Sequence, residues 1–246
     1  MSCIDINCDL GEGMPNDAFL MPFISSANIS CGFHAGDETS IRTTIRLAKG
    51  NQVSIGAHPG FADKENFGRK EIELSADGYY QLVMEQLLFF RRIAREEGAS
   101  IHHVKAHGAL YNMAAKATII ANELARAVAD FDSSLIFYGL SNSLMLTEAK
   151  KLGLKTASEV FADRTYQEDG SLTPRAQKNA MWNEVETATR QAIMMANEKK
   201  VVATSGKIIP VKADTLCIHG DGDHALEFAK AIYHSLKEKN IEIKPI

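Results

Sequence analysis

Short hydrophobic runs alternate with longer amphipathic stretches along the whole chain. The short runs have the length and flanking residues that are typical of buried strands. The pattern predicts strands in the following segments: 3–10, 26–31, 53–58, 101–107, 134–139, 155–163 and 214–221.

The longer stretches carry hydrophobic side chains at helical spacing. In residues 37–49, Ile41, Ile45 and Ala48 fall on one helical face, and Asp37 is well suited to cap the first turn. The same spacing predicts further helices at 75–98, about 115–130, 142–152, 175–198 and 223–238. Residues 201–211 are predicted to form a hairpin around Ser205 and Gly206.

Regular alternation of strands and helices predicts parallel strands that are joined by right-handed crossovers. The chain length accommodates about seven such units in one domain over residues 1–246. We therefore predict an α/β fold, a (β/α) barrel with about seven parallel strands, and an open doubly wound sheet is the alternative. The longest irregular segment, residues 58–74, is expected to form a lid or a substrate loop.

Composition and charge narrow the classes of partner. Hydrophobic residues make up 45% and charged residues 24% of the chain, which is ordinary for a globular protein. The net charge of −4 comes without a basic stripe, so nucleic acid is not an expected partner. No run approaches the ~20 apolar residues that cross a membrane, and no signal-peptide pattern opens the chain. Four cysteines without a Cys-x-x-Cys pair favour a cytoplasmic protein with reduced thiols.

Polar residues recur where the predicted strands end. They are Asn7, Asp9, Glu12, Asn28, His34, Asp37, His58, Lys105, His107, Tyr111, Asn112, Glu159, Asp163, Arg164, His219 and Asp221. The carboxyl ends of barrel strands meet on one face, and that face holds the active site in such folds. Individually, Asp37 could serve only as a helix cap and Glu159 only as a salt-bridge partner inside the barrel. Of the adjacent His102 and His103, one is expected to face outward.

Two kinds of chemistry fit this set. Convergent imidazoles from His34, His58, His107 and His219 could bind a divalent metal together with Asp9, and the metal would activate water. A metal-free acid/base site is equally compatible, with burial lowering the pKa of Lys105 so that it acts as a base. The sequence contains no P-loop, no Gly-x-Gly-x-x-Gly motif and no Gly-x-Ser-x-Gly elbow.

Several long motifs, in order, closely resemble the LamB/YcsF family. They are "DINCDLGEG" (5–13), "ANISCGFHAGD" (27–37), "IGAHPGFAD" (55–63), "FGRK" (67–70), "VKAHGALYN" (104–112), "EVFADRTY" (159–166), "GSLTPR" (170–175) and "CIHGDGDHA" (217–225). The resemblance extends from residue 5 to about residue 236.

The resemblance implies a seven-stranded barrel related to the glycoside hydrolase/deacetylase superfamily. It also implies a hydrolase that acts on a cyclic amide, opening 5-oxoproline to L-glutamate with coupled hydrolysis of ATP. In this activity the chain would work together with two further subunits, B and C. ATP would carry Mg²⁺ as its counter-ion and would bind either this chain or a partner.

The same resemblance supplies candidate site residues. By motif match, the catalytic candidates are Asp9, Glu12, His34, His58, Lys105, His107 and Asp221. The candidates for substrate binding are Asn28, Arg69 and Arg164. Any metal is expected at Asp9, His34 and His58, the counterparts of a deacetylase Asp-His-His set. The alternatives are a stand-alone metal-dependent amidohydrolase or deacetylase, and a non-catalytic regulator of lactam utilisation.

Overall fold

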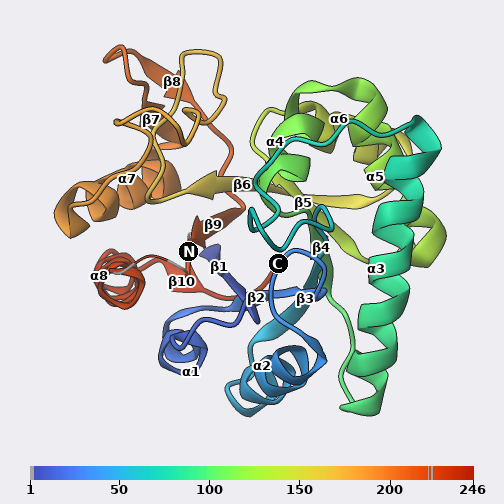
Figure 1. The fold of residues 1–246 in the computed structure, drawn as a ribbon. Helices are drawn as coiled ribbons and strands as arrows, with labels where there is room; N and C mark the ends of the chain where they lie inside the picture. The colour runs from blue at the N-terminus through green and yellow to red at the C-terminus, as the bar shows by residue number, and fades with distance from the viewer. Residues whose placement is uncertain (1–2, 221, 223) are drawn as a thin grey trace.

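Seven parallel strands close into a barrel in the computed structural model, which describes residues 3–220, 222 and 224–246 (Figure 1). The barrel strands, in spatial order, are β1 (Cys3–Leu10), β2 (Ser26–Ser30), β3 (Ser54–His58), β4 (His103–Lys105), β5 (Ile136–Leu140), β6 (Lys155–Phe161) and β9 (Thr215–Ile218). Closure comes from β9, which pairs in parallel with both β6 and β1. A short strand, β10 (Glu242–Ile243), adds to the first residues of β1. The predicted barrel is confirmed, and the open-sheet alternative is wrong.

Helices surround the barrel, as Figure 1 shows. The longer ones are α2 (Glu38–Gly50), α3 (Ala76–Glu96), α4 (Gly108–Lys116), α5 (Thr118–Asp132), α6 (Leu144–Lys151), α7 (Val185–Glu198) and α8 (Ala225–Glu238). Two short elements, α1 (Asp17–Leu20) and the 3₁₀ helix η1 (Met21–Phe23), connect β1 to β2. The Asp37 side chain accepts a hydrogen bond from Ser40 N, and Ser40 Oγ accepts one from Asp37 N, so the expected cap of α2 is a complete capping box.

Alternate side chains of β1 face two different environments. Ile4 and Ile6 belong to the large hydrophobic core between the strands and the helices. Asp5, Asn7 and Asp9 instead make hydrogen bonds to side chains from other strands across the barrel interior. Because successive side chains of a strand point to opposite faces, the barrel interior is polar while its outer wall is apolar. Polar groups are therefore available directly beneath the carboxyl ends of the strands.

The structure corrects the predicted elements in two places. The helix predicted at about 115–130 is confirmed as α5, but the preceding helix α4 is absent from the prediction, and Ala117, in an extended conformation, separates the two. The helix predicted at 175–198 begins only at Val185, because the preceding chain forms an irregular segment, residues 162–184. Isolated bridges between Arg164 and Met181 and between Tyr166 and Leu172 hold this segment together. One of the paired histidines faces inward as expected, since His103 is buried and His102 is partly exposed.

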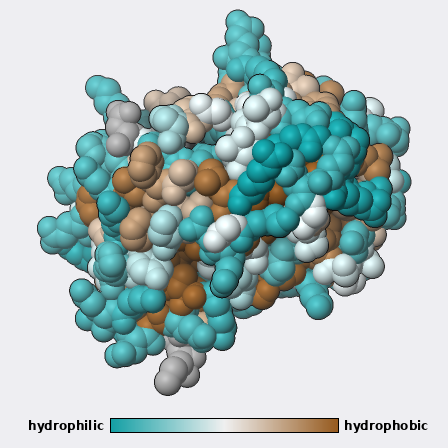
Figure 2. Space-filling view, turned by 90° about the horizontal axis from the view of Figure 1, so that it is seen from below, coloured by the Kyte–Doolittle hydropathy of each residue, from teal (hydrophilic) through white to brown (hydrophobic). Residues whose placement is uncertain are grey.

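A β-hairpin and a network of ion pairs lie on the outside of the barrel. The predicted hairpin forms from β7 (Lys200–Val202) and β8 (Ile208–Pro210) and stands outside the barrel (Figure 1). Arg42 of α2 contacts Glu96 and Glu97 at the end of α3, and Arg92 of α3 contacts Glu38. Figure 2 shows strongly hydrophilic residues spread over one face of the molecule, with hydrophobic residues in smaller patches between them. None of the described helices has the length and apolarity that crossing a membrane requires.

Candidate functional site

A small pocket opens at the carboxyl ends of the strands. The candidates obtained by motif match that line it are Asp9, Glu12, His58, Arg69, Lys105, His107 and Arg164, and the strand-end residues Tyr111, Asn112 and His219 line it as well. His34 and Asn28 are buried and take no part in its lining, and Asp221 lies outside the described residues. The convergence predicted from the strand ends is therefore present in the fold.

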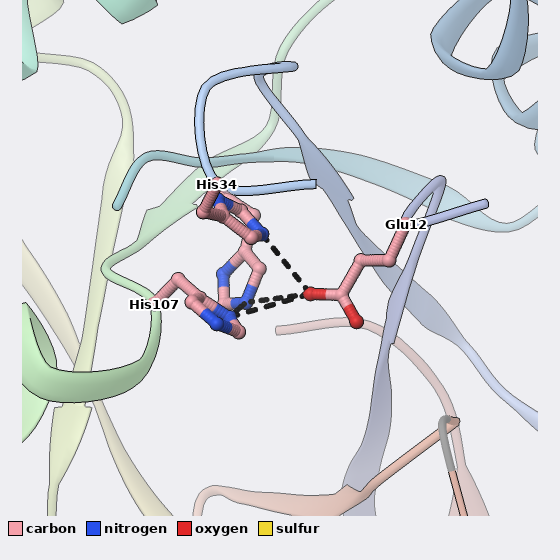
Figure 3. A group of neighbouring side chains, drawn as sticks. Glu12, His34 and His107 are labelled. Carbon is pink, nitrogen blue, oxygen red and sulfur yellow. Dashed lines mark hydrogen bonds and ion pairs between the residues drawn. The ribbon is translucent and has the colours of Figure 1, made fainter. Parts of the chain in front are cut away.

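A cluster of three histidines and one glutamate lies beside the pocket. Figure 3 shows Glu12 pointing its carboxylate toward His34 and His107. Glu12 Oε1 lies 3.1 Å from His34 Nε2 and 3.3 Å from His107 Nδ1. His58 Nε2 lies 2.9 Å from His107 Nδ1. The rings of His34 and His107 are stacked, with centroids 3.8 Å apart and planes inclined by 6°.

Backbone carbonyls orient two of these rings. His58 Nδ1 lies 2.8 Å from the carbonyl oxygen of Lys105, and His107 Nε2 lies 2.9 Å from that of Phe67. A carbonyl oxygen only accepts, so each of these nitrogens carries the proton and donates. Burial, reinforced by the other histidines, holds the pKa of His107 and of His34 well below the usual histidine range. The second nitrogen of each carbonyl-bonded ring therefore faces the cluster.

The segment that was expected to be a lid or a substrate loop supports this cluster. It supplies the Phe67 carbonyl, and it places Gly60 and Gly68 against the stacked rings. A Cβ on Gly68 would lie 2.8 Å from His34 Cβ and 3.0 Å from His107 Cδ2. Gly68 also has φ +63°, a conformation that side chains disfavour. Glycine at this position is what allows the two rings to stack beneath the loop.

Lys105 is a buried cation in the floor of the pocket. Its Nζ lies 2.8 Å from Glu159 Oε1, 2.9 Å from Asp9 Oδ1, 3.1 Å from Cys217 Sγ and 3.2 Å from Asn7 Oδ1. Burial disfavours the charge, but Asp9, Cys217 and Glu159 outweigh it and hold the pKa of Lys105 well above its usual value. The expectation that burial lowers this pKa and makes Lys105 a base is wrong. The expectation that Glu159 could form a salt bridge inside the barrel is confirmed.

Asn28 fixes Asp9 from below. Its Nδ2 donates to Asp9 Oδ1 at 2.7 Å and to Asn7 Oδ1 at 2.7 Å, and its Oδ1 accepts from His103 Nε2 at 2.8 Å. Burial alone would raise the pKa of Asp9, but His58 and Lys105 outweigh it, so that this pKa lies well below the usual value. Asp9 is consequently an anion with a fixed orientation at the pocket floor.

A histidine–aspartate pair stands on another side of the pocket, and neither residue is among the catalytic candidates obtained by motif match. His219 Nδ1 lies 2.8 Å from Asp163 Oδ2 and 3.0 Å from Asp163 Oδ1, and the His219 ring lines the pocket. Although burial acts in the opposite direction, His219 holds the pKa of Asp163 below its usual value. The sequence signal that could have identified both residues is their position, because Asp163 follows β6 and His219 follows β9. Their mutual contact, across 56 residues, is not visible in the sequence.

The two arginines differ in their environment. Arg164 is buried, and its guanidinium donates to the Thr173 carbonyl at 2.6 Å and to the Ala180 carbonyl at 3.3 Å. Burial lowers its pKa to about 10. Arg164 thus ties down the irregular segment 162–184, besides lining the pocket. Arg69 is exposed at the pocket wall and lies over the Phe67 ring, with Cζ 4.8 Å from the centroid.

Two groups of the described side chains have the donor atoms and spacing that could hold a metal ion. The first is Glu12, His34, His58 and His107, whose ligand atoms all lie within 4.8 Å of one another. The second is Asp9, Cys217 and His219. The deacetylase-like set of Asp9, His34 and His58 does not coincide with either group. The cluster with several imidazoles is the better candidate for a transition metal, because imidazole suits such ions.

Comparisons with known proteins place this site in context. The family model described as LamB/YcsF family matches residues 4–246. The chain is 49% identical over 249 residues to the 5-oxoprolinase A subunit of Tolumonas auensis, covering 99% of both proteins. Its fold matches the crystal structure of the lactam utilization protein from Thermus thermophilus with a TM-score of 0.93 at 38% identity, covering 99% of this chain and 100% of that one. A GH18 chitinase from Pseudoalteromonas aurantia, with a TM-score of 0.54 at 9% identity, covering 96% of this chain and 100% of that one, shares the barrel fold alone.

Proposed function

Because this chain belongs to the LamB/YcsF family, we propose that it opens the lactam ring of 5-oxoproline to give L-glutamate, as one component of a multi-subunit, ATP-dependent 5-oxoprolinase. The observation that carries the proposal is the similarity over 99% of both chains to a protein named as the A subunit of 5-oxoprolinase. The pocket supports it, because anionic, cationic and imidazole groups surround one small space. The partners would be subunits B and C.

The need for ATP follows from the stability of the substrate. A lactam is a resonance-stabilised amide, so water adds to its carbonyl carbon slowly. Transfer of the terminal phosphoryl group from ATP to the lactam oxygen would release ADP and make that carbon a better electrophile. Water would then add to the carbon, the carbon–nitrogen bond would break, and the ring nitrogen would take up a proton. A second water would cleave the resulting acyl phosphate, releasing phosphate and L-glutamate.

We assign the nucleotide to the partner subunits and the ring opening to this chain. The sequence has no P-loop, and Lys105, the buried lysine in the pocket floor, is held by carboxylates of the chain itself. A reaction that consumes ATP would take place in the cytoplasm, where the free cysteines Cys3, Cys8, Cys31 and Cys217 would stay reduced. Mg²⁺ would accompany the nucleotide at the partner's site.

The pocket residues divide into three roles in this proposal. His58 and His107, with Glu12, would form the part of the pocket that activates the attacking water. Lys105 would stabilise the negative charge that develops on the substrate oxygen. His219, held in orientation by the Asp163 carboxylate, would give a proton to the departing ring nitrogen, because it lines the same pocket.

Substrate orientation is assigned to the remaining predicted residues. Arg69, at the wall of the pocket, would bind the carboxylate of 5-oxoproline through a bidentate contact. Arg164 would contribute charge from its buried position while it holds the segment 162–184. Asn28 would act on the substrate only through Asp9, because its own polar atoms bond Asp9, Asn7 and His103. Asp221, outside the described residues, stays a catalytic candidate by its position after β9.

The decisive experiment measures L-glutamate release from 5-oxoproline with Mg-ATP. The purified chain is assayed alone and then together with subunits B and C. Glutamate from the mixture alone supports the proposal. Glutamate from the chain alone would place the nucleotide site on this chain. Absence of glutamate from every combination, with all partners shown to be folded, would refute the proposal.

A second candidate function is a metal-dependent amidohydrolase that needs no ATP. The observation in its favour is the group of Glu12, His34, His58 and His107, which could hold a metal ion. This candidate predicts amide hydrolysis without nucleotide and loss of that activity on treatment with a chelator. A purely regulatory role is less compatible with the pocket, because it gives no reason for acid/base groups to surround a shared space.

A further inference from the structure

We propose that Glu12, His58 and His107 bind one divalent transition-metal ion, of the class of Zn²⁺ or Co²⁺. His34 has a different role in this proposal and positions the ligands without binding the metal itself. The inference concerns the chemistry of the cluster and does not rest on the identity of the lactam substrate.

The first argument is the direction of the lone pairs. His58 Nδ1 and His107 Nε2 both donate to backbone carbonyls, so in neutral rings the lone pairs lie on His58 Nε2 and His107 Nδ1. These two atoms nevertheless face each other at 2.9 Å. Glu12 Oε1, another acceptor, lies 3.3 Å from His107 Nδ1 and 3.9 Å from His58 Nε2. Three acceptors that converge on one point need a positive centre between them.

The second argument is the spacing of these atoms. In a tetrahedral zinc site with bonds of about 2.0–2.1 Å, neighbouring ligand atoms are roughly 3.3 Å apart. The separations of 2.9, 3.3 and 3.9 Å bracket this value, so shifts of a few tenths of an ångström would complete the geometry. Two imidazoles and one carboxylate are a ligand set suited to Zn²⁺ or Co²⁺, whereas Mg²⁺ prefers oxygen ligands.

The third argument is the support around the ligands. Metal-binding histidines generally donate their other ring N–H to a carbonyl or a carboxylate, which fixes the tautomer. Both His58 and His107 already make this bond to a carbonyl. Glu12, His58 and His107 also line the pocket, so a bound ion would keep a coordination position open toward a substrate or water. The ion would then activate that water.

His34 is excluded as a simultaneous ligand by its stacking on His107. An imidazole binds a metal in the plane of its ring, and two parallel rings 3.8 Å apart cannot both point their lone pairs at one ion. His34 Nε2 instead faces Glu12 Oε1 at 3.1 Å, where the N–H donates to the carboxylate. Because His34 does not line the pocket, we assign it the role of holding Glu12 and His107 in place.

In the second group of potential ligands, Asp9, Cys217 and His219, the ammonium group of Lys105 already contacts two of the three side chains. Lys105 Nζ lies 2.9 Å from Asp9 Oδ1 and 3.1 Å from Cys217 Sγ. A metal ion bound to Asp9 and Cys217 would have to share this space with the ammonium group. The geometry therefore favours one metal, at Glu12, His58 and His107.

The test is metal binding by the metal-depleted full-length chain, without any activity assay. Equilibrium dialysis with Zn²⁺ measures stoichiometry and affinity, and the visible spectrum of added Co²⁺ reports the coordination geometry. The variants are His58→Ala, His107→Ala and the near-isosteric Glu12→Gln. The matched control is His234→Ala, which removes an exposed histidine on α8. Circular dichroism checks that each variant is folded.

We expect one Zn²⁺ per chain and a four- or five-coordinate Co²⁺ spectrum in the unmodified protein and in His234→Ala. Affinity should fall more than about 100-fold in His58→Ala, His107→Ala and Glu12→Gln. His34→Phe keeps a stacking ring and should still bind one ion, with affinity reduced by about 10–100-fold, as for other outer-sphere partners.

Several results would overturn the proposal. Failure of the folded, unmodified chain to bind Zn²⁺ would mean that the cluster holds only a shared proton. Binding that is unaffected by Glu12→Gln, where folding is least at risk, would place the ion elsewhere. Binding that survives His107→Ala but is lost in His34→Phe would show that the ligand set is wrong. The glutamate assay with subunits B and C tests the proposed reaction separately, so the two proposals can fail independently.

Discussion

Replacement of Lys105 by methionine would remove a buried positive charge without a large change in side-chain volume. Lys105 lies between the carboxylates of Asp9 and Glu159, and its exposed surface is only 2%. Without the ammonium group, two carboxylates would remain in an interior that no longer compensates them. We therefore expect Lys105→Met to be one of the most destabilising single substitutions in the barrel.

The magnitude follows from the distances. At an effective dielectric constant of ~20, charges 2.8 and 2.9 Å apart attract each other by about 6 kcal/mol per pair, and much of this offsets the cost of burying the charges. Removal of one partner of a buried ion pair typically costs about 3–5 kcal/mol. For a chain of this length, that lowers the melting temperature by on the order of 10 °C. Lys105→Met with Glu159→Gln should recover part of the loss, because one carboxylate is then neutral.

The loss of stability in Lys105→Met should depend on pH, and the pKa shifts give the direction of this dependence. The raised pKa of Lys105 and the lowered pKa of Asp9 mean that their stabilisation is present throughout pH 5–8 in the unmodified protein. In Lys105→Met, burial without a counter-charge favours neutral carboxyl groups, so the folded state gains protons relative to the unfolded chain. The free energy of unfolding should consequently differ most from the unmodified protein at pH 8 and less at pH 5.

Urea denaturation of the unmodified protein, Lys105→Met and the double variant at both pH values measures these quantities. A loss below about 1 kcal/mol at pH 8 would refute the reasoning, since it lies well under the usual cost of breaking a buried ion pair. So would a double variant that is no more stable than Lys105→Met, because the cost would then not arise from the uncompensated carboxylate of Glu159.

The remaining predictions concern catalysis and local geometry. His58→Ala should lower glutamate release with subunits B and C by at least about 10²-fold while leaving the circular dichroism spectrum unchanged, and a fully active variant would remove His58 from the site. His219→Gln should lower kcat more than it changes KM, since its role is proton transfer. Asp163→Asn should cost stability at pH 7, by urea denaturation, and the difference should shrink below about pH 4, because the lowered pKa of Asp163 stabilises the fold only while its carboxyl is ionised. Gly68→Ala and Gly170→Ala should both add about 1–2 kcal/mol of backbone strain, at φ +63° and +85°, but only Gly68→Ala should also lower activity, since a Cβ at Gly170 meets no described atom within 4 Å.

The fold was largely predictable from local patterns. Alternation of short apolar runs with amphipathic stretches was sufficient to predict a parallel barrel, and Asp37 marked the start of α2. The failures lie where tertiary contacts override local preference. The segment 162–184 contains residues that are compatible with a helix. Its backbone carbonyls instead accept hydrogen bonds from the Arg164 guanidinium, and isolated β-bridges pair parts of the segment. The helix α4 was missed, and no glycine or proline marks the boundary at Ala117 that separates it from α5.

The candidate site was predictable as a location and less so as a set of interactions. Position at or shortly after the end of a strand identified Asp9, Glu12, His58, Lys105 and His107, and these residues line one pocket. The same criterion did not separate the residues that face the pocket from those that lie behind it. The sequence also led to the wrong direction for the pKa of Lys105. Its burial could be inferred from the pattern, but its two carboxylate partners could not.

Periodicity and the geometry of parallel strands were enough to define the barrel, the face that carries the site and most of the side chains available there. The charge, tautomer and partner of each group depend instead on contacts between distant parts of the chain. Lys105 meets Asp9 across 96 residues, and His107 meets Glu12 across the barrel mouth. The carbonyls that fix His58 and His107 belong to the backbone, which every residue shares. A contact with a backbone carbonyl leaves no trace in residue identity, so only the folded chain can reveal which way these imidazoles face.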